Sequence, residues 1–247
     1  MFRDFFEVVP ADTPELLEEV FRLRYQVYCL ETKFEDSSNF SDGLERDEFD
    51  ERSVHGLLRH RRSGIYAGTV RLVLPDPGNL ASLPLHGVTN HPLFYDNNRF
   101  APSKVAEVSR FAISKSFRQR LDEFQSPSAA GSFDPERERQ YKEQELKVLP
   151  HIVLGLFISM LQLSRDLGIQ EWFCVMEKAL VRLLDRYSLH FEPVGPAVEY
   201  HGLRQPCVAN IDEFLLRAKA ERPEIWELIT ESEAESTSSF PMCQSGT

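Results

Sequence analysis

The 247-residue sequence contains only four cysteines, and no two of them form a Cys-x-x-Cys pair. They are Cys29, Cys174, Cys207 and Cys243. The seven histidines are scattered as well, without a His-x-x-x-His or mixed ligand spacing. Because metal sites in proteins need such spacings, we expect no metal site. A chain of this length buries a core without disulfides, and its free thiols indicate a reducing cytoplasm.

The sequence also lacks an excess of basic residues, an uninterrupted apolar run and a nucleophilic serine motif. Its net charge of −11 argues against nucleic-acid binding, which needs a basic face to neutralise phosphates. The longest apolar segment, residues 152–163, is interrupted by Ser159 and Gln162 and is too short to cross a bilayer, so we expect no transmembrane segment. The first residues mix acids with apolar side chains and lack a small-residue cleavage site, so no secretory signal is expected. Without a Gly-x-Ser-x-Gly elbow, a serine hydrolase is disfavoured.

The order of the predicted elements indicates an α+β domain. Strands are predicted near the N-terminus and at residues 53–60, 66–74, 105–113 and 171–176, with extended segments at 191–198 and 206–211. Helices are predicted at residues 14–28, 150–168, 178–187 and 212–229. A block of antiparallel strands followed by helix, strand and helix matches neither a Rossmann alternation nor an all-β meander.

We expect a single domain over residues 1–229. Residues 119–145 mix charges with a Ser-Pro-Ser-Ala-Ala-Gly-Ser stretch and show no apolar period, so a mobile insertion is expected there. Residues 230–247 are rich in Ser, Thr and Glu, which predicts a disordered tail.

Two opposite charges interrupt a segment that otherwise has the pattern of a buried strand. Glu107 and Arg110 lie among Val105, Val108 and Phe111. Side chains three apart on a regular strand point to opposite faces, so at least one of the two is expected to point inward. A buried charge costs several kcal/mol unless it is paired, so such a residue belongs to a structural ion pair or to a site.

Similar charges occur upstream in apolar surroundings. Arg24 lies on the first predicted helix, Asp47 and Asp50 lie in an acidic loop, and Arg71 lies within a run of apolar residues. We predict that these charges share one network with the strand pair. Each residue alone is equally consistent with a structural ion pair, but the set favours a site.

Four segments carry a family resemblance in the right order: residues 21–28, 47–50 (Asp-Glu-Phe-Asp), 68–72 (Gly-Thr-Val-Arg-Leu) and 107–111 (Glu-Val-Ser-Arg-Phe). Together they resemble the autoinducer synthase branch of the GNAT acyltransferase fold. This branch comprises acyl-homoserine-lactone synthases, long-chain N-acyl amino acid synthases and, most similar here, exosortase-associated acyltransferases. The resemblance implies a three-layer sandwich in which helices flank a mixed, mostly antiparallel central sheet.

The resemblance also implies a site. It places six charged residues beside the acceptor amine: Arg24, Asp47, Asp50, Arg71, Glu107 and Arg110. Glu107 is the first candidate for the base that deprotonates the amine, with a backbone carbonyl, a water chain or a purely structural role as alternatives. Catalytic roles are expected for the motif residues Ser109 and Arg110 as well. Asp47 and Asp50 would suit an ammonium group, or form only a solvated acidic loop. Arg71 or Arg110 could hold an acceptor carboxylate.

The substrates are expected to contact further residues. Phe34 stands where the lactone synthases usually have Trp, which puts recognition of S-adenosylmethionine in doubt. The acyl chain needs an apolar slot, and Trp172, Phe173 and Met176, with Leu156, Phe157 and Met160 on the next helix, are either its walls or ordinary core.

The donor is expected to be a thioester, with no tightly bound cofactor. Relatives that use coenzyme A usually carry a glycine-rich Arg/Gln-x-x-Gly-x-Gly/Ala loop after the fourth strand, where a helix N-terminus holds the diphosphate. Residues 115–120 contain no glycine. We therefore favour an acyl carrier protein, docked on a basic patch, with acyl-CoA as the alternative. The patch comprises Lys104, Lys115, Arg118 and Arg120.

The sequence thus predicts an N-acyltransferase that moves a fatty acyl group from a thioester to the amine of an amino acid or a related small molecule. Two alternatives remain open. One is an acyl-homoserine-lactone synthase that uses S-adenosylmethionine. The other is a module without catalytic activity that senses an acyl carrier protein or a lipid.

Overall fold

The computed structural model describes residues 2–124 and 135–230. The strands are β1 (Phe6–Pro10), β2 (Ser53–His60), β3 (Tyr66–Val73), β4 (Val105–Ile113), β5 (Glu171–Glu177), β6 (Glu192–Pro193), β7 (Val198–Glu199) and β8 (Leu203–Asn210). The α-helices are α1 (Phe2–Phe5), α2 (Pro14–Arg24), α3 (Ser116–Phe124), α4 (Pro135–Val148), α5 (Ile152–Leu167), α6 (Lys178–Asp185), α7 (Ile211–Glu221) and α8 (Pro223–Thr230). A π-helix, η1 (Tyr25–Glu31), continues α2, and a short 3₁₀ turn, η3 (Glu48–Arg52), precedes β2.

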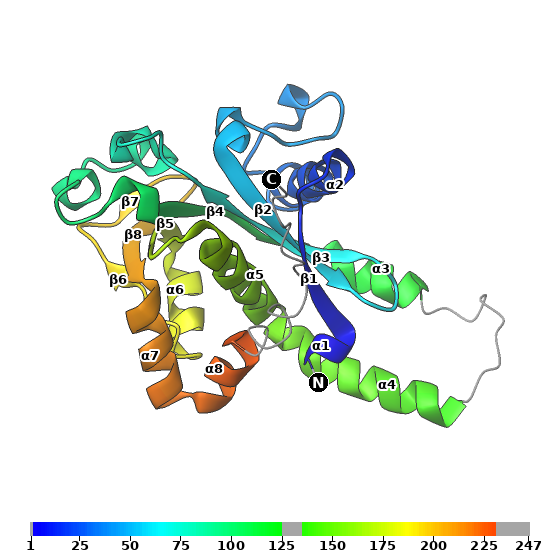
Figure 1. Cartoon of the computed structure of the whole chain (residues 1–247). Helices are drawn as coiled ribbons and strands as arrows, with labels where there is room; N and C mark the ends of the chain where they lie inside the picture. The colour runs from blue at the N-terminus through cyan, green and yellow to red at the C-terminus, as the bar shows by residue number, and fades with distance from the viewer. Residues whose placement is uncertain (1, 125–134, 231–247) are drawn as a thin grey trace, which may run out of the picture.

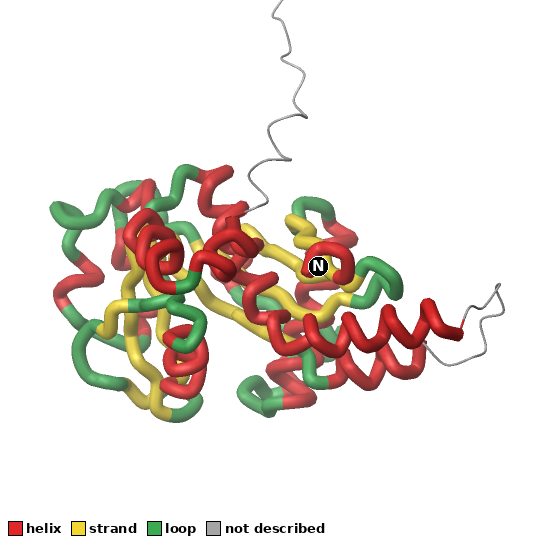
Figure 2. Tube along the Cα trace, turned by 90° about the horizontal axis from the view of Figure 1, so that it is seen from below, coloured by secondary structure: helices red, strands yellow, loops and turns green. Residues whose placement is uncertain are grey.

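The strands form one mixed sheet, as predicted. Its order is β1-β2-β3-β4-β5-β8-β6, and β7 pairs with β8. All pairings are antiparallel except that of β4 with β5. Helix α5 packs on β1 to β4 on one face, while α2 packs on β2 and β3 on the other. The result is the expected sandwich, with the strands running between helices (Figures 1 and 2).

The only parallel pair in the described sheet is short, and its two strands separate. Pairing of β4 with β5 runs from Val105 opposite Glu171 to Val108 opposite Cys174. The remaining residues of β4 pair with β3 alone, and those of β5 pair with β8 alone. The sheet therefore opens between the C-terminal halves of β4 and β5.

Strand β4 contains a bulge that corrects one prediction. Arg71 pairs with Ser109 and Thr69 with Ala112, so two residues of β4, Arg110 and Phe111, oppose one residue of β3. Arg110 has a φ of +48°, in the left-handed region. The bulge breaks the alternation of faces, so Arg110 reaches the same side as Ser109 instead of lying opposite Glu107.

Close packing explains the glycine of the segment 68–72. A Cβ atom on Gly68 would lie 2.7 Å from the carbonyl oxygen of Ala112 on β4. Another side chain there would push β3 and β4 apart next to the bulge. The glycine thus permits the close pairing of β3 with β4 next to the bulge that orients Arg110.

The longest apolar helix is a core element. The helical stretch Arg139–Leu167 is long and apolar enough to pass a length-and-composition test for a membrane span, yet 67% of its apolar window is buried in the molecule. Residues on nearly every side of α5 are buried against the sheet and against α8. This packing accounts for the apolar run that the sequence shows.

The segment predicted as a mobile insertion contains helix on both sides. Helix α3 covers residues 116–124 and α4 covers residues 135–148, while residues 125–134 lie outside the described part of the chain. Tyr141 of α4 packs on the ring of Phe5 at 4.9 Å, and Glu145 of α4 lies 2.9 Å from His60. The tail predicted from residue 230 onward falls outside the described residues, except that Thr230 ends α8.

Candidate active site

A cavity of about 410 Å³ lies where β4 and β5 separate. One end is polar and is formed by the acidic loop and β4, with Asp47, Arg71, Glu107, Ser109 and Arg110 in its wall. The other end is apolar and lies between α5, α6 and β5. Because the cavity combines a charged end with an apolar end, it has the form expected of a site that binds an amphipathic ligand.

The polar end rests on a largely buried network of three arginines and four carboxylates. Arg24 is fully buried at the end of α2 and bonds to Glu45 through its Nε and to Asp50 through its Nη1, the latter at 2.6 Å. Arg24 does not line the cavity. Arg24 was expected beside the acceptor amine, but it lies behind the cavity wall and holds the acidic loop in place.

Arg71 connects the acidic loop to β4. Its Nη1 lies 2.6 Å from Asp47 Oδ1 and 2.7 Å from Asp50 Oδ1. Its Nε donates to Ser109 Oγ at 2.9 Å. The two aspartates and Arg71 thus converge as predicted, and Ser109 orients the guanidinium.

Arg110 closes the network on the cavity side. Its Nη2 lies 2.9 Å from Glu45 Oε1, 3.2 Å from Asp47 Oδ2 and 3.4 Å from Glu35 Oε1. Its guanidinium also lies over the ring of Tyr28, 5.3 Å from the centroid. Arg71 and Arg110 are each already bound to at least two carboxylates, so neither offers the free two-point clamp that was expected for an acceptor carboxylate.

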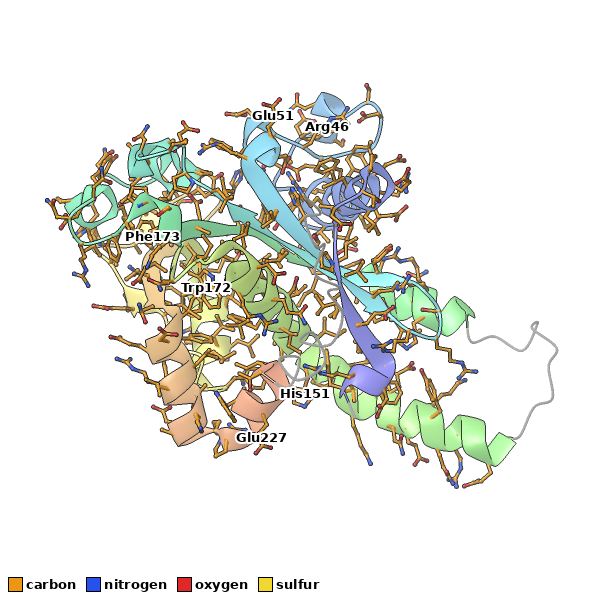
Figure 3. The ribbon with its side chains drawn as sticks, in the orientation of Figure 1. Arg46, Glu51, His151, Trp172, Phe173 and Glu227 are labelled. Atoms are coloured by element: carbon orange, nitrogen blue, oxygen red, sulfur yellow. The ribbon has the colours of Figure 1, made fainter. Side chains whose placement is uncertain are left out.

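The acidic loop is preorganised by its own backbone. Asp47 caps η3 by accepting from the N–H of Phe49 at 3.0 Å, and Asp50 accepts from the N–H of Asp47 at 2.8 Å. Burial would raise the pKa of Asp50, but Arg24, Arg71 and this backbone N–H lower it to about 2. Asp50 is therefore ionised near neutral pH. Figure 3 shows the loop through Arg46 and Glu51, which flank the two aspartates.

Glu107 stands apart from the ion pairs. Its side chain, only 5% exposed, accepts a hydrogen bond from the backbone N–H of Leu85 at 2.7 Å. Burial raises the pKa of Glu107 to about 7, although the Leu85 N–H, Arg71 and Arg110 act in the opposite direction. The structural alternative, a partner of Arg110 or Arg24, does not hold, because those two guanidinium groups bind Glu45 instead. A buried carboxyl that titrates near neutral pH on a cavity wall has the properties of a general base.

The apolar end contains some of the residues that were predicted to hold the acyl chain. Phe157, Met160 and Met176 line the cavity, together with Leu184 and Phe191. Trp172, Phe173 and Leu156 are buried core residues and do not belong to the cavity wall.

Trp172 is a core residue for a clear reason. Its indole N–H donates to Ser164 Oγ at 2.9 Å, and its ring packs against Phe191 and Phe214. Phe173, its neighbour on β5, points to the other face (Figure 3). Its ring packs on that of Phe94. The assignment of Trp172 to substrate binding was therefore wrong.

Phe34 lies at the polar end of the cavity. Its ring lies 5.8 Å from that of His201, and the guanidinium of Arg204 lies 5.4 Å from its centroid. All three side chains line the cavity. Phe34 thus lies in the cavity wall, and its contact with substrate stays a prediction.

The predicted docking patch is divided. Lys104 precedes β4, whereas Lys115 and Arg120 follow its end, and a nine-residue strand separates them by about 30 Å. Lys104 and Lys115 are exposed, and Arg120 donates to Ser114 Oγ at 3.3 Å. The side chain of Arg118 lies outside the described part of the structure. A single patch over all four residues is therefore wrong, and only the α3 end lies near the cavity.

Glu45 and Glu35 belong to the network but were not predicted from the sequence. Both lie in an acid-rich segment with no periodicity, so local spacing could not distinguish them from solvated acids. Glu45 is nevertheless almost fully buried because it bonds to both Arg24 and Arg110. Counting charges gave no signal either, because the three predicted arginines were already matched by the three predicted carboxylates.

Comparison with known proteins agrees with this geometry. Residues 23–123 match the family model described as acetyltransferase (GNAT) domain. No curated protein sequence matches the chain.

Several solved structures share the fold. TofI in a ternary complex with an inhibitor and MTA has a TM-score of 0.57 at 19% identity, covering 90% of this chain and 99% of its own. The CoA-dependent acyl-homoserine lactone synthase BjaI, with SAM and isopentyl-CoA, has a TM-score of 0.51 at 18% identity over 93% of this chain and 89% of its own. FeeM, an N-acyl amino acid synthase from uncultured soil microbes, has a TM-score of 0.51 at 12% identity over 86% of this chain and 94% of its own. At these identities the likeness establishes the fold.

Proposed function

We propose that this protein, which carries a GNAT acyltransferase domain over residues 23–123, transfers a fatty acyl group from a thioester to the amine of an amino acid or a related small molecule. The observation that carries the proposal is the position of Glu107. Its buried carboxyl lies in the wall of the polar end, on β4 one residue before the last pair that joins β4 to β5.

The reaction needs an unprotonated amine, because an ammonium group has no lone pair with which to attack. The ammonium group first releases one proton to solvent. As the neutral amine nitrogen bonds to the thioester carbonyl carbon, Glu107 takes a second proton from it, directly or through a water molecule. The carbon–sulfur bond then breaks, and the proton passes to the leaving thiolate, which yields an amide and a free thiol. A pKa of about 7 suits this exchange, since the carboxyl can accept and return a proton near neutral pH.

The opened sheet supplies the remaining parts of the mechanism. Beyond Val108 and Cys174 the two strands no longer pair, so backbone N–H groups at the opening can stabilise the negative charge on the thioester oxygen. The acyl chain lies between Phe157, Met160 and Met176. Water is thereby kept from the thioester.

The acceptor amine is attracted by carboxylates at the polar end. Glu35 and Asp47 are the partly exposed acids there, with side chains 26% and 19% exposed. Four carboxylates of the network face three arginines, so one negative charge is left over at this end of the cavity. An ammonium group is therefore held next to Glu107 before it loses its proton.

A product assay tests the proposal. Purified protein is incubated with acyl carrier and acyl-CoA thioesters and pooled amino acids, with S-adenosylmethionine in a separate arm, and products are identified by mass spectrometry. N-acyl amino acids that disappear with Glu107→Gln but persist with Trp172→Phe support the proposal. A lactone formed only from S-adenosylmethionine identifies an autoinducer synthase. Binding of an acyl thioester without any product identifies a sensor.

A further inference from the structure

The carboxylate of Glu31 occupies the N-terminus of α3. Glu31 is the last residue of η1, and its Oε2 accepts from the backbone N–H of Lys115 at 2.8 Å. Its Oε1 accepts from the backbone N–H of Ser116 at 3.1 Å and from Ser114 Oγ at 3.0 Å. Burial alone would raise the pKa of Glu31, but these hydrogen bonds lower it. The group is therefore an anion at neutral pH.

The first N–H groups of a helix have no intrahelical partner, and together with the helix dipole they bind anions such as phosphates. Helix α3 follows β4 directly and is nine residues long. Two of the N–H groups at its start are directed at Glu31. The chain has thus supplied its own anion at a position where a phosphate would otherwise bind.

This helix start adjoins the cavity. Ile113, one residue before Ser114, lines the cavity, and so does Thr32, the residue after Glu31. A thioester whose acyl chain lies between β4 and β5 therefore has its pantetheine arm leaving close to the start of α3. In coenzyme A this arm continues into a diphosphate, whereas in a carrier protein it ends in a single phosphate ester on the protein surface.

We propose that Glu31 is a specificity residue that excludes the diphosphate of coenzyme A from the α3 N-terminus, so that the donor is a carrier-protein thioester. The inference rests on the proposed acyl transfer from a thioester. Glu31 acts by filling the two N–H donors and by repelling a second anion. Recognition of the donor is thereby left to the acyl-pantetheine arm and to contacts with the carrier surface.

The test compares three donors with one acyl chain: octanoyl-pantetheine, octanoyl-CoA and octanoyl carrier protein. For the unmodified protein, the KM values of octanoyl-CoA and octanoyl-pantetheine agree within about threefold, because the nucleotide and diphosphate add no binding. Glu31→Gln lowers the KM of octanoyl-CoA about tenfold, equivalent to about 1.4 kcal/mol, and leaves that of octanoyl-pantetheine unchanged. The neutral amide releases one backbone N–H, and Arg120 lies close enough to Ser114 to favour a phosphate.

A matched control removes the same charge elsewhere. Glu18→Gln alters an exposed ion pair with Arg22 on α2 and leaves all three KM values unchanged. A KM for octanoyl-CoA at least tenfold below that of octanoyl-pantetheine in the unmodified protein overturns the inference. That comparison decides the matter even if Glu31→Gln loosens α3, which a melting curve reports.

Failure of the proposed function gives a different result. If no thioester is turned over, equilibrium dialysis with free CoA and free pantetheine still tests Glu31. Tighter binding of CoA than of pantetheine by Glu31→Gln, but not by the unmodified protein, supports the inference. Equal binding of both ligands by the two proteins, or tighter CoA binding already in the unmodified protein, refutes it.

Discussion

Replacement of Glu107 by Gln should abolish activity and yet stabilise the protein above neutral pH. Burial raises the pKa of this carboxyl from 4.5 to about 7. A raised pKa means that the native state favours the protonated form, so the full stability is present below pH 4.5 and is lost as pH rises through 7. The difference between the two pKa values corresponds to about 3 kcal/mol at pH 8.

The variant removes this cost because a neutral amide of the same shape can still accept from the N–H of Leu85. We expect Glu107→Gln to raise the free energy of unfolding at pH 8 by up to about 3 kcal/mol, or roughly 6–12 °C in Tm. At pH 4.5 the variant and the unmodified protein should be equally stable. Urea unfolding at several pH values, followed by circular dichroism, measures both expectations.

Activity gives the second half of the same prediction. The rate of the unmodified protein should rise with pH through about 7 as Glu107 ionises, whereas Glu107→Gln should show no such inflection. Retained turnover in the variant would contradict the assignment of the base. Equal destabilisation of the variant at pH 4.5 and pH 8 would show instead that the carboxyl is a structural group with an ordinary pKa.

Three further variants test the other parts of the site. Asp50→Asn should lose about 2 kcal/mol of stability at pH 7, because the pKa of Asp50 is lowered to about 2; the loss should vanish below pH 2, as acid unfolding of both proteins measures. Met160→Trp should narrow the apolar slot and shift donor preference to shorter chains, each excluded methylene costing about 0.8 kcal/mol in kcat/KM comparisons; an unchanged profile would move the acyl chain elsewhere. Trp172→Phe should lower the free energy of unfolding by about 1 kcal/mol through its lost bond to Ser164 without changing chain-length preference, and a changed preference would return Trp172 to the slot.

The sequence predicted those parts of the site that short motifs encode. Asp47 and Asp50 are three residues apart, which is the spacing of a capped turn, and Arg71 interrupts a strand that is otherwise apolar. A charged residue within an apolar segment can be recognised from the sequence alone, because a buried charge needs a partner. The network that joins them to Arg24 was inferred from this need.

Other parts could not be predicted because they depend on long-range geometry. Glu45 looks like any acid of its loop until the fold brings it against Arg24 and Arg110, which lie 21 and 65 residues away in sequence. The sequence patterns of β4 and β5 do not show that the two strands separate, nor that a cavity lies between them. The alternation rule even pointed the wrong way at Arg110, because it assumes a strand without a bulge.

Helix α4 was missed for a different reason. Its surface is mostly polar, so it lacks the apolar stripe from which helices are recognised. Exposed pairs such as Glu136 with Arg139 support it locally, and its contacts with the core are few and partly polar, including Glu145 with His60. A helix stabilised in this way cannot be distinguished from a charged loop by hydrophobic periodicity.

The bulge in β4 decides which carboxylates the guanidinium of Arg110 binds. On a regular strand, the guanidinium of Arg110 would enter the apolar face that Val108 occupies. The left-handed residue, at a cost of about 1–2 kcal/mol, turns it instead onto Glu45 and Asp47. Arg110 is thereby ion-paired with the carboxylates of the acidic loop. Glu107 on the same strand instead accepts a hydrogen bond from the backbone N–H of Leu85. The pKa of Glu107 near 7 follows from its burial, which the N–H of Leu85 and the charges of Arg71 and Arg110 offset only in part.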